Sequence, residues 1–359
     1  MKQTYFDTLL QIIRGSDSGE ITNTQTLIGD FINQLDFEKK TEDLDCYIFA
    51  AALSKQFDFE NDTNINLYLQ RFEVSQIILF NMLAKHFPLA SIASHLANKI
   101  LEQFIELHDE ISILNIGIGT GRQELALINE LELNGKLPKK LILFAVEPSD
   151  ESLSQAKSNI QAAAAEKGIE LVFHSFCTTA EEMTPETWDF ISKSEYPLLV
   201  NAAFALHHIH ELEDDFDTRN RVIQHIYDLN PLAVIMCEPH VNHNTSSLEE
   251  RFQNCWRHFK TVFNIINQSE LSHEGKTALK LFFRREIEDI LGKPENIRTE
   301  RHELGEKWVE RLSLSGFSPV NLDILPDVPM PNGFSVRWNN DYLGLEYEKE
   351  TLISILVQK

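Results

Sequence analysis

The chain has 359 residues, of which 43 % are hydrophobic, enough to bury one large core or two smaller ones. The formal net charge is −23 and lysine and arginine form no cluster, so neither nucleic acid nor an anionic membrane surface is expected as a main partner. The scattered cysteines, the lack of a signal-peptide pattern and the absence of an apolar run near the roughly 20 residues that span a bilayer indicate a cytoplasmic protein without membrane contact.

Residues 1–108 are expected to form helices. Apolar residues recur there at helical spacing, as with Leu96, Ile100 and Ile105, and no run alternates as a strand would. The segment is interpreted as a helical cap that leads into the first core strand, with a plain helical bundle as the alternative.

The central feature of the chain is the stretch Ile111–Gly121, which reads I-S-I-L-N-I-G-I-G-T-G. A short apolar run is followed at once by glycines at alternate positions, Gly117, Gly119 and Gly121, and then by a helix-like segment at Arg122–Leu133. This pattern predicts a buried strand that turns tightly into a helix beneath a nucleotide-like ligand, because glycine lets a ligand lie against bare backbone. Alone, it does not separate a ligand site from an ordinary tight turn.

Apolar runs alternate with helix-like segments after this turn. The runs are expected to be strands and lie at Leu141–Val146, Leu171–Ser175, Leu198–Ala202 and Leu232–Cys237. Apolar strands that alternate with helices indicate a parallel sheet covered on both faces, which binds its ligands at the carboxyl ends of the strands.

The last third of the chain departs from this alternation. Residues 245–291 are expected to form an inserted pair of long helices above the strand ends. A helix is expected at Gly305–Ser315 and a strand at Phe317–Leu322, and the chain closes with two alternating runs, Tyr342–Tyr347 and Thr351–Val357, that predict an antiparallel hairpin.

Glu147, which follows the second strand, can accept hydrogen bonds from both ribose hydroxyls of an adenosine cofactor. The alternative is a surface glutamate that caps the next helix. NAD would use the same parts, but its fingerprint spaces the glycines G-x-G-x-x-G. The G-x-G-x-G spacing and the closing hairpin favour S-adenosylmethionine (SAM) instead.

These observations predict an α/β fold with a Rossmann-like SAM-methyltransferase core of seven strands, the last of them antiparallel, and a helical cap. The expected domains are a cap at 1–108 and a core at 109–359, with the helical pair 245–291 inserted in the core.

Polar residues at the strand ends are the candidate site. Those expected to contact the cofactor are Asn115, Gly117, Gly119, Gly121, Glu147, Thr178 and Asn201. Those expected to act in catalysis are His208, Glu238 and His243, since a histidine or carboxylate could take a proton from the acceptor group. The alternative is that some of these side chains tie neighbouring loops together. No metal site is expected, because the histidine spacing matches no familiar motif such as H-E-x-x-H.

Several segments resemble, in order, motifs of the GRAS family, which is known chiefly from plant transcriptional regulators. They are H-L-A-N-K-I-L-E-Q-F at 95–104, I-L-N-I-G-I-G-T-G at 113–121, N-A-A-F-A-L-H-H-I at 201–209, E-P-H-V-N-H-N at 238–244, R-T-E-R-H-E at 298–303 and K-W-V-E-R-L-S-L-S-G-F at 307–317. The resemblance implies a SAM-methyltransferase-like Rossmann core with a helical cap.

Two residues depart from the plant pattern. Plant members generally lack an acid after the second strand and are regarded as non-enzymatic scaffolds, whereas this chain has Glu147. Asn115 replaces the acid that is usual at that point of the first strand. The chain therefore resembles bacterial GRAS relatives, a group expected to include methyltransferases for small molecules.

We predict a SAM-dependent methyltransferase that acts on a small-molecule substrate under the helical cap. The alternative is a non-catalytic GRAS-type binding or scaffold protein that recognises a protein or a small signalling ligand. An NAD-dependent oxidoreductase is disfavoured by the glycine spacing. The sequence leaves open the substrate, the acceptor atom and a homodimer.

Overall fold

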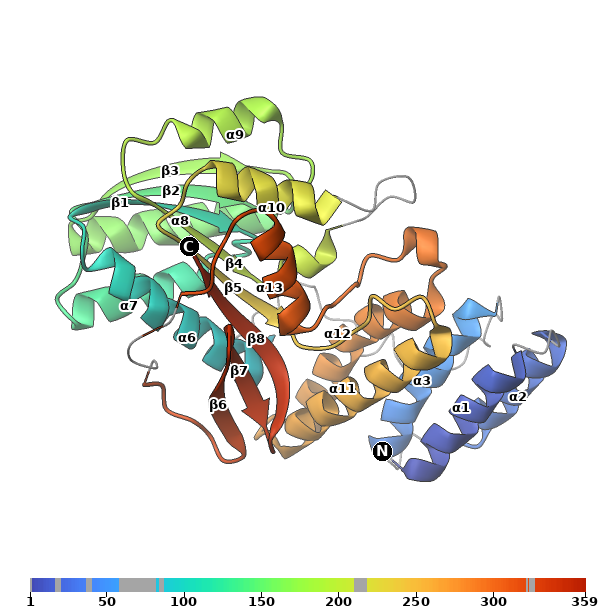
Figure 1. Ribbon diagram of the computed structural model, residues 1–359. Coiled ribbons are helices and arrows are strands. Elements are labelled where there is room, and N and C mark those ends of the chain that lie inside the picture. The colour runs from blue at the N-terminus through green and yellow to red at the C-terminus, as the bar shows by residue number, and fades with distance from the viewer. Residues whose placement is uncertain are drawn as a thin grey trace. The chain divides into compact units, whose positions relative to one another are not determined.

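The structure, a computed structural model, describes residues 2–16, 21–36, 41–57, 82–83, 87–209, 218–320, 322 and 327–359. The chain divides into two compact units (Figure 1). Unit 1 comprises Met1–Phe87 and Val241–His302, and unit 2 comprises Pro88–His240 and Glu303–Lys359. None of the described helices is long and apolar enough to cross a lipid bilayer.

Unit 2 is built on one sheet. Its strands are β1 (Glu110–Ile116), β2 (Lys140–Val146), β3 (Glu170–Phe176), β4 (Leu198–Ala203), β5 (Ala233–Pro239), β6 (Phe334–Asn339), β7 (Tyr342–Tyr347) and β8 (Glu350–Gln358). Their order is β3-β2-β1-β4-β5-β8-β7-β6, in which β1 to β5 are parallel and β8, β7 and β6 are antiparallel (Figure 1). The fold is therefore mixed α/β with a mainly parallel sheet, and the five apolar runs expected as strands are β1 to β5.

Helices cover both faces of this sheet. They are α6 (Pro88–Ile105), α7 (Arg122–Leu133), α8 (Asp150–Lys167), α9 (Pro185–Ser192), α10 (Thr218–Asp228) and α13 (Gly305–Leu314), with a short 3-10 turn η1 (Leu206–His208) after β4. Apolar residues of α9, α10 and α13, among them Trp188, Ile223 and Trp308, pack with strand residues in one core. The helices α6, α7 and α8 pack side by side and cover the other face (Figure 1).

The sheet differs from the expected one in two places. It has eight strands, whereas the predicted core has seven, and one of the eight, β6 (Phe334–Asn339), was not expected and pairs with β7. This edge strand follows a proline-rich loop and is only half-buried, so no continuous apolar run marks it in the sequence. The strand expected at Phe317–Leu322 is absent from the described part of that segment, where Pro319 forms only an isolated bridge with Gln358.

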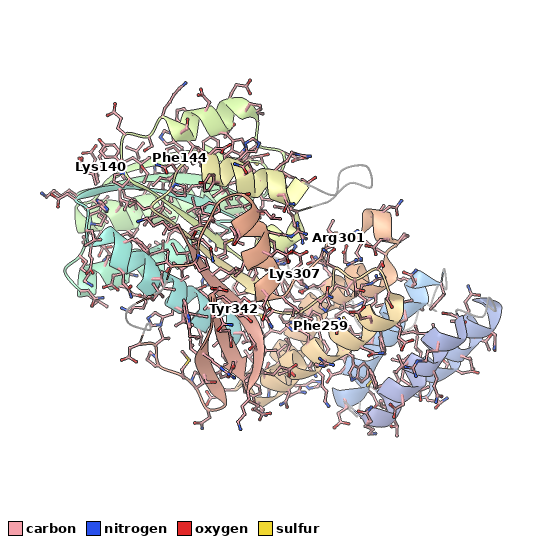
Figure 2. All side chains as sticks on the ribbon, viewed as in Figure 1. Lys140, Phe144, Phe259, Arg301, Lys307 and Tyr342 are labelled. Carbon is pink, nitrogen blue, oxygen red and sulfur yellow. The ribbon has the colours of Figure 1, made fainter. Side chains whose placement is uncertain are left out.

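Unit 1 is helical. Its elements are α1 (Gln3–Ser16), α2 (Ile21–Asn33), α3 (Thr41–Gln56), α11 (Leu248–Gln268), α12 (His273–Gly292) and the 3-10 turn η2 (Glu295–Ile297). Aromatic side chains fill the core around α11, where Phe49 of α3 lies 4.8 Å from Trp256 between ring centroids. Phe259, labelled in Figure 2, is buried, and its ring lies 6.1 Å from that of Phe263. The two long helices expected within 245–291 are α11 and α12.

The boundary expected at residue 108 does not match this division. The helix α6 belongs to unit 2, because its buried face, which includes Leu96 and Leu101, packs against β5, β8 and α7. Helical spacing alone could not show that α6 covers the sheet rather than joining the helices before it.

A buried ion pair joins two helices of unit 1. Lys280 of α12 places Nζ 2.5 Å from Oδ1 of Asp45 on α3, and the two side chains are 0 % and 2 % exposed. The ammonium group also lies 5.7 Å from the centre of the Phe263 ring. Because a buried charge is costly without its partner, this pair fixes how α3 and α12 pack.

Removing one charge of this pair should destabilise the protein strongly. We expect Lys280→Met to lower the free energy of unfolding by about 3–5 kcal/mol, because it leaves the Asp45 carboxylate buried and unpaired. The double variant Lys280→Met with Asp45→Leu should recover most of the loss. Urea unfolding of the set measures this, and equal losses in the single and double variants would contradict it.

Candidate functional site

The glycine stretch forms the predicted tight turn between β1 and α7. Gly117, Gly119 and Gly121 have φ angles of 80°, 54° and 73°, in the left-handed region that favours glycine. The Gly117 N–H donates to the carbonyl of Val146 at the end of β2, at 2.9 Å. The strand–turn–helix expected from the sequence is thus confirmed.

The three glycines have different surroundings. A Cβ atom at Gly117 would lie 2.8 Å from Cβ of Ala205, and one at Gly121 would lie 2.8 Å from a methyl group of Ile160. A Cβ at Gly119 would meet no atom within 4 Å. Gly117 and Gly121 are therefore required for packing, whereas Gly119 presents bare backbone to open space.

Glu147 lies beside this turn, as expected, but its carboxylate is engaged with the protein. One oxygen accepts a hydrogen bond from the Gly119 N–H and the other accepts one from the Ser149 N–H, both at 3.0 Å. The side chain thereby ties the glycine turn to the start of α8. Each oxygen keeps a second lone pair for a ligand.

The two asparagines at the strand ends turn toward α7. Asn115 and Asn201 are opposite one another in the β1–β4 register. The Asn115 amide donates to the carboxyl group of Glu124, and the Asn201 oxygen accepts from Gln123 at 3.4 Å. Both asparagines are buried, so in this structure their side chains serve the protein's own network.

Thr178, expected near an adenine ring, lies in the loop after β3. Its hydroxyl donates to the backbone carbonyl of Thr179 at 3.2 Å, and the side chain is half-buried. All seven residues predicted to contact a cofactor belong to unit 2, and their role in binding stays a prediction.

Glu124 was missed by the sequence reasoning. It lies in the first turn of α7 and is 6 % exposed, and its second carboxyl oxygen has no hydrogen-bond partner among the described residues. Burial raises the pKa of the Glu124 carboxyl to about 7. Nothing in the sequence distinguishes this glutamate from a surface residue that favours a helix N-terminus.

Glu238 forms a buried pair with His207, one of the histidines after β4. The Glu238 carboxylate is fully buried, accepts the Leu206 N–H at 2.9 Å and lies 2.5 Å from Nδ1 of His207. Burial raises the pKa of Glu238 to about 7. His208, which was predicted to act in catalysis, is exposed, with its ring 3.9 Å from that of His207.

This pair is anchored from α10. The Arg219 guanidinium donates to the His207 carbonyl at 2.7 Å and lies 5.4 Å from the centre of the Trp308 ring. Arg311 of α13 forms two hydrogen bonds, at 2.6 and 2.7 Å, to the carboxylate of Glu303. These contacts favour the loop-tying alternative for Glu238 over proton transfer to a substrate.

His243, the third predicted catalytic residue, belongs to unit 1. It is fully buried, its Nδ1 lies 2.7 Å from Nδ1 of His302, and its ring stacks on Phe259. The sequence analysis expected these three residues in one candidate site. In the structure, His208 and Glu238 belong to unit 2, whereas His243 belongs to unit 1.

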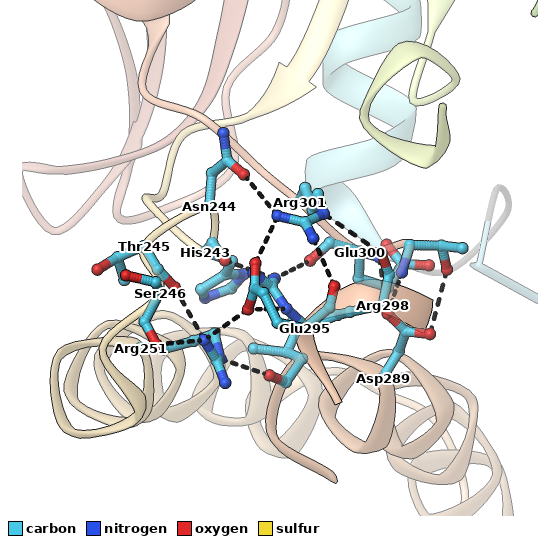
Figure 3. Close-up of polar contacts among 12 residues, drawn as sticks. His243, Asn244, Thr245, Ser246, Arg251, Asp289, Glu295, Arg298, Glu300 and Arg301 are labelled. Carbon is cyan, nitrogen blue, oxygen red and sulfur yellow. Dashed lines mark hydrogen bonds and ion pairs between the residues drawn. The ribbon is translucent and has the colours of Figure 1, made fainter. Parts of the chain in front are cut away.

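Three arginines of unit 1 converge on one carboxylate (Figure 3). Glu295, in η2, accepts hydrogen bonds from Arg251 at 3.3 Å, from Arg298 at 2.9 Å and from Arg301 at 2.6 Å. The arginine side chains are 0–7 % exposed, whereas that of Glu295 is 44 % exposed. Arg298 also donates to the His243 carbonyl at 2.6 Å, so the cluster ties together segments far apart in the sequence.

Burial lowers the pKa of two of these arginines, Arg251 and Arg298. Burial, with the neighbouring charge of Arg298 as the next cause, lowers the pKa of Arg251 to about 10. The motif R-T-E-R-H-E carries part of the family resemblance, but nothing in the sequence identifies Glu295 as the shared partner.

Glu124 should make stability depend on pH. Its pKa is raised in the folded state, so the folded protein binds more protons and loses stability as pH rises from about 4.5 to about 7. The difference between these values corresponds to roughly 3 kcal/mol. We expect Glu124→Gln to remove this part of the pH dependence, measured by urea unfolding across pH 4.5–8, with the exposed Glu151→Gln as control. Parallel curves for Glu124→Gln and the unmodified chain would show that Glu124 is not responsible.

Glu295 should be needed for the stability of unit 1. Glu295→Ala leaves three buried guanidinium groups without their shared carboxylate, and we expect a loss of about 2–3 kcal/mol, reduced from the fully buried case because Glu295 is partly exposed. The control is Glu249→Ala, which removes the surface pair with Arg14 and should change the unfolding midpoint little. Similar midpoints for both variants would contradict the role of the cluster.

Comparison with known proteins identifies the family of the chain. The model of the GRAS domain family matches residues 7–326. Scarecrow-like protein 1 of Arabidopsis thaliana is 27 % identical over 68 % of this chain and 43 % of its own length, and Scarecrow-like transcription factor PAT1 of the same plant is 24 % identical over 64 % and 48 %. The crystal structure of SCL7 of Oryza sativa matches all of both chains with a TM-score of 0.78 at 19 % identity, which shows the shared fold.

These findings correct the main functional prediction. The chain spans about half the length of the curated relatives it matches, and one of them is named as a transcription factor. The prediction of a SAM-dependent methyltransferase is therefore wrong, and the Glu238 carboxylate is fully buried with its oxygens engaged by Leu206 and His207. Because the family model covers most of its length, the chain belongs to the GRAS domain family.

Proposed function

We propose that the chain is a non-catalytic GRAS-type binding protein that recognises a partner protein or a small signalling ligand, and that it acts in the cytoplasm. The observation that carries this proposal is the family match over residues 7–326. The burial of Glu238 and His243, each held by neighbouring side chains, supports it, because groups used within the protein are not offered to a substrate.

The arrangement of unit 2 supports a further part of this proposal, that the core is Rossmann-like and that its glycine turn holds an adenosyl ligand such as SAM. Open space above Gly119 fits a ligand that lies against backbone, and the second lone pairs of the Glu147 carboxylate could accept ribose hydroxyls. A bound SAM would supply an adenosine for recognition and a charged sulfonium group. The residues of this chain would bind and orient it.

The role of Glu147 differs from that of a simple ribose acceptor. Its carboxylate already orders the turn through the Gly119 N–H and the start of α8 through the Ser149 N–H. A ligand that bound there would therefore contact a turn already tied to α8. We propose that ligand binding stabilises this segment for recognition of a partner.

Binding without turnover is the expected behaviour. Incubation with radiolabelled SAM and fractionated metabolite extracts should yield no more than one equivalent of S-adenosylhomocysteine for each protein molecule. Calorimetry should show SAM binding that Glu147→Ala weakens at least tenfold and that Glu151→Ala leaves unchanged.

The two measurements have separate meanings. Sustained formation of S-adenosylhomocysteine by the unmodified chain, lost in Glu147→Ala, would overturn the non-catalytic proposal. Failure to bind SAM in a folded sample would instead show that the glycine turn does not hold an adenosyl ligand. The proposal of a binding protein that recognises other partners would remain.

A further inference from the structure

The strand β3 forms one edge of the sheet, with β2 on its inner side (Figure 1). Alternate residues of β3 form its hydrogen bonds on the β2 side. The Glu170 N–H donates to the Lys139 carbonyl at 2.9 Å, and the Phe176 carbonyl accepts from the Glu147 N–H at 3.1 Å. In a parallel strand the residues between these point their backbone groups the other way. The residues that turn N–H and C=O groups to the outer edge are Leu171, Phe173 and Ser175.

This edge is suited to pairing. Within the described residues no strand lies beyond β3, and its register with β2 runs without a bulge from Glu170 to Phe176. The strand contains no proline. A row of unpaired backbone groups on a regular edge strand is a template for another extended chain.

A surface cavity of about 540 Å³ lies along the same edge. It is lined by Lys157 of α8, by residues 173–176 of β3, and by Glu186, Thr187 and Phe190 of α9. Successive residues of a strand face opposite sides of the sheet, so a cavity lined by four in a row runs over the edge rather than over one face. The helices α8 and α9 form its two walls.

The wall on the α9 side is aromatic. Phe190 is 46 % exposed, and its ring lies 5.0 Å from that of His174 and 6.3 Å from that of Phe176. His174 in turn stacks on Phe144 of β2, which is labelled in Figure 2. An apolar side chain of an added strand could cover Phe190 here.

The two walls carry opposite charges. Lys157 on α8 and Glu186 on α9 are both exposed. Hydrogen bonds from its own backbone N–H and from Thr184 lower the pKa of Glu186, so this carboxylate stays ionised at neutral pH. An extended segment directs alternate side chains to opposite walls, so the complementary segment carries an acidic residue toward Lys157 and a basic residue toward Glu186.

This charge arrangement disfavours a second copy of the chain. Two copies joined by antiparallel β3 strands would be related by a two-fold axis perpendicular to the sheet. That axis places Lys157 beside Lys157 and Glu186 beside Glu186, and it brings together two chains that each carry a net charge of −23.

We propose that the β3 edge binds an extended segment of a partner protein as an added strand, with apolar and basic side chains toward α9 and acidic or hydroxyl side chains toward α8. This inference rests on the binding function proposed above and adds a class of partner to it, a protein with an extended segment. The test uses a peptide and no SAM, so its outcome does not depend on the adenosyl ligand.

A designed peptide tests the surface directly. The probe is an acetylated nonapeptide whose odd positions carry lysine, valine and phenylalanine and whose even positions carry threonine and aspartate. We expect a Kd below about 100 μM, measured by fluorescence anisotropy. Hydrogen exchange followed by NMR should show new protection of the Leu171, Phe173 and Ser175 amides and little change at Val172 and His174. The same peptide N-methylated at alternate residues should not bind.

Matched variants separate the contribution of the backbone hydrogen bonds to peptide affinity from that of the aromatic wall. Ser175→Pro removes one outward N–H without touching the bonds to β2 and should weaken the peptide at least tenfold, whereas Ser175→Ala should bind as the unmodified chain does. Phe190→Ala should weaken binding about fivefold, and Leu133→Ala, another exposed apolar position, should have no effect.

Three results would overturn the proposal. They are the absence of peptide binding, binding that leaves the three outward amides unprotected, and equal affinities for Ser175→Pro and Ser175→Ala. A dimer in sedimentation equilibrium that Ser175→Pro dissolves would assign the edge to a second copy instead. None of these results bears on turnover of SAM, so failure here is distinct from failure of the proposed function.

Discussion

The need to pair buried charge governs both units of this protein. Lys280 has Asp45, three buried arginines share the partly exposed Glu295, and Glu238 has His207, each at hydrogen-bonding distance. A buried charge without a partner costs several kcal/mol, so these contacts restrict how the helices and loops can pack. Burial of apolar side chains drives folding, and the ion pairs determine which of the apolar packings is allowed.

The same constraint explains why residue type was a poor guide to function. Histidines and carboxylates at strand ends are typical of catalytic sites, and the sequence places them there. In the structure, however, a carboxylate such as Glu238 uses both oxygens on the protein itself. The family model that matches the chain is that of the GRAS domain, and one of the similar proteins is named as a transcription factor.

The sequence predicted the parallel part of the sheet well, because strands buried on both faces are continuous apolar runs and glycine turns are unambiguous. It missed β6, whose residues alternate between half-buried and exposed positions, and it placed α6 with the wrong helices. It identified Glu147 but not its hydrogen bond to Gly119. It could not identify Glu124 or Glu295, because the partner of a buried charge depends on contacts between segments that are distant in the chain.

The hydrogen bond between Glu147 and the Gly119 N–H has a consequence for affinity. The carboxylate acts as an internal competitor, since a ligand that needs that N–H must first displace it. The observed affinity is then the intrinsic affinity multiplied by the fraction of molecules with the bond open. A hydrogen bond to a charged group contributes roughly 1.5–3 kcal/mol, so this competition weakens such a ligand about 10- to 100-fold. A ligand held through the Glu147 carboxylate itself, as proposed above for a ribose, leaves this hydrogen bond in place and does not meet that competition.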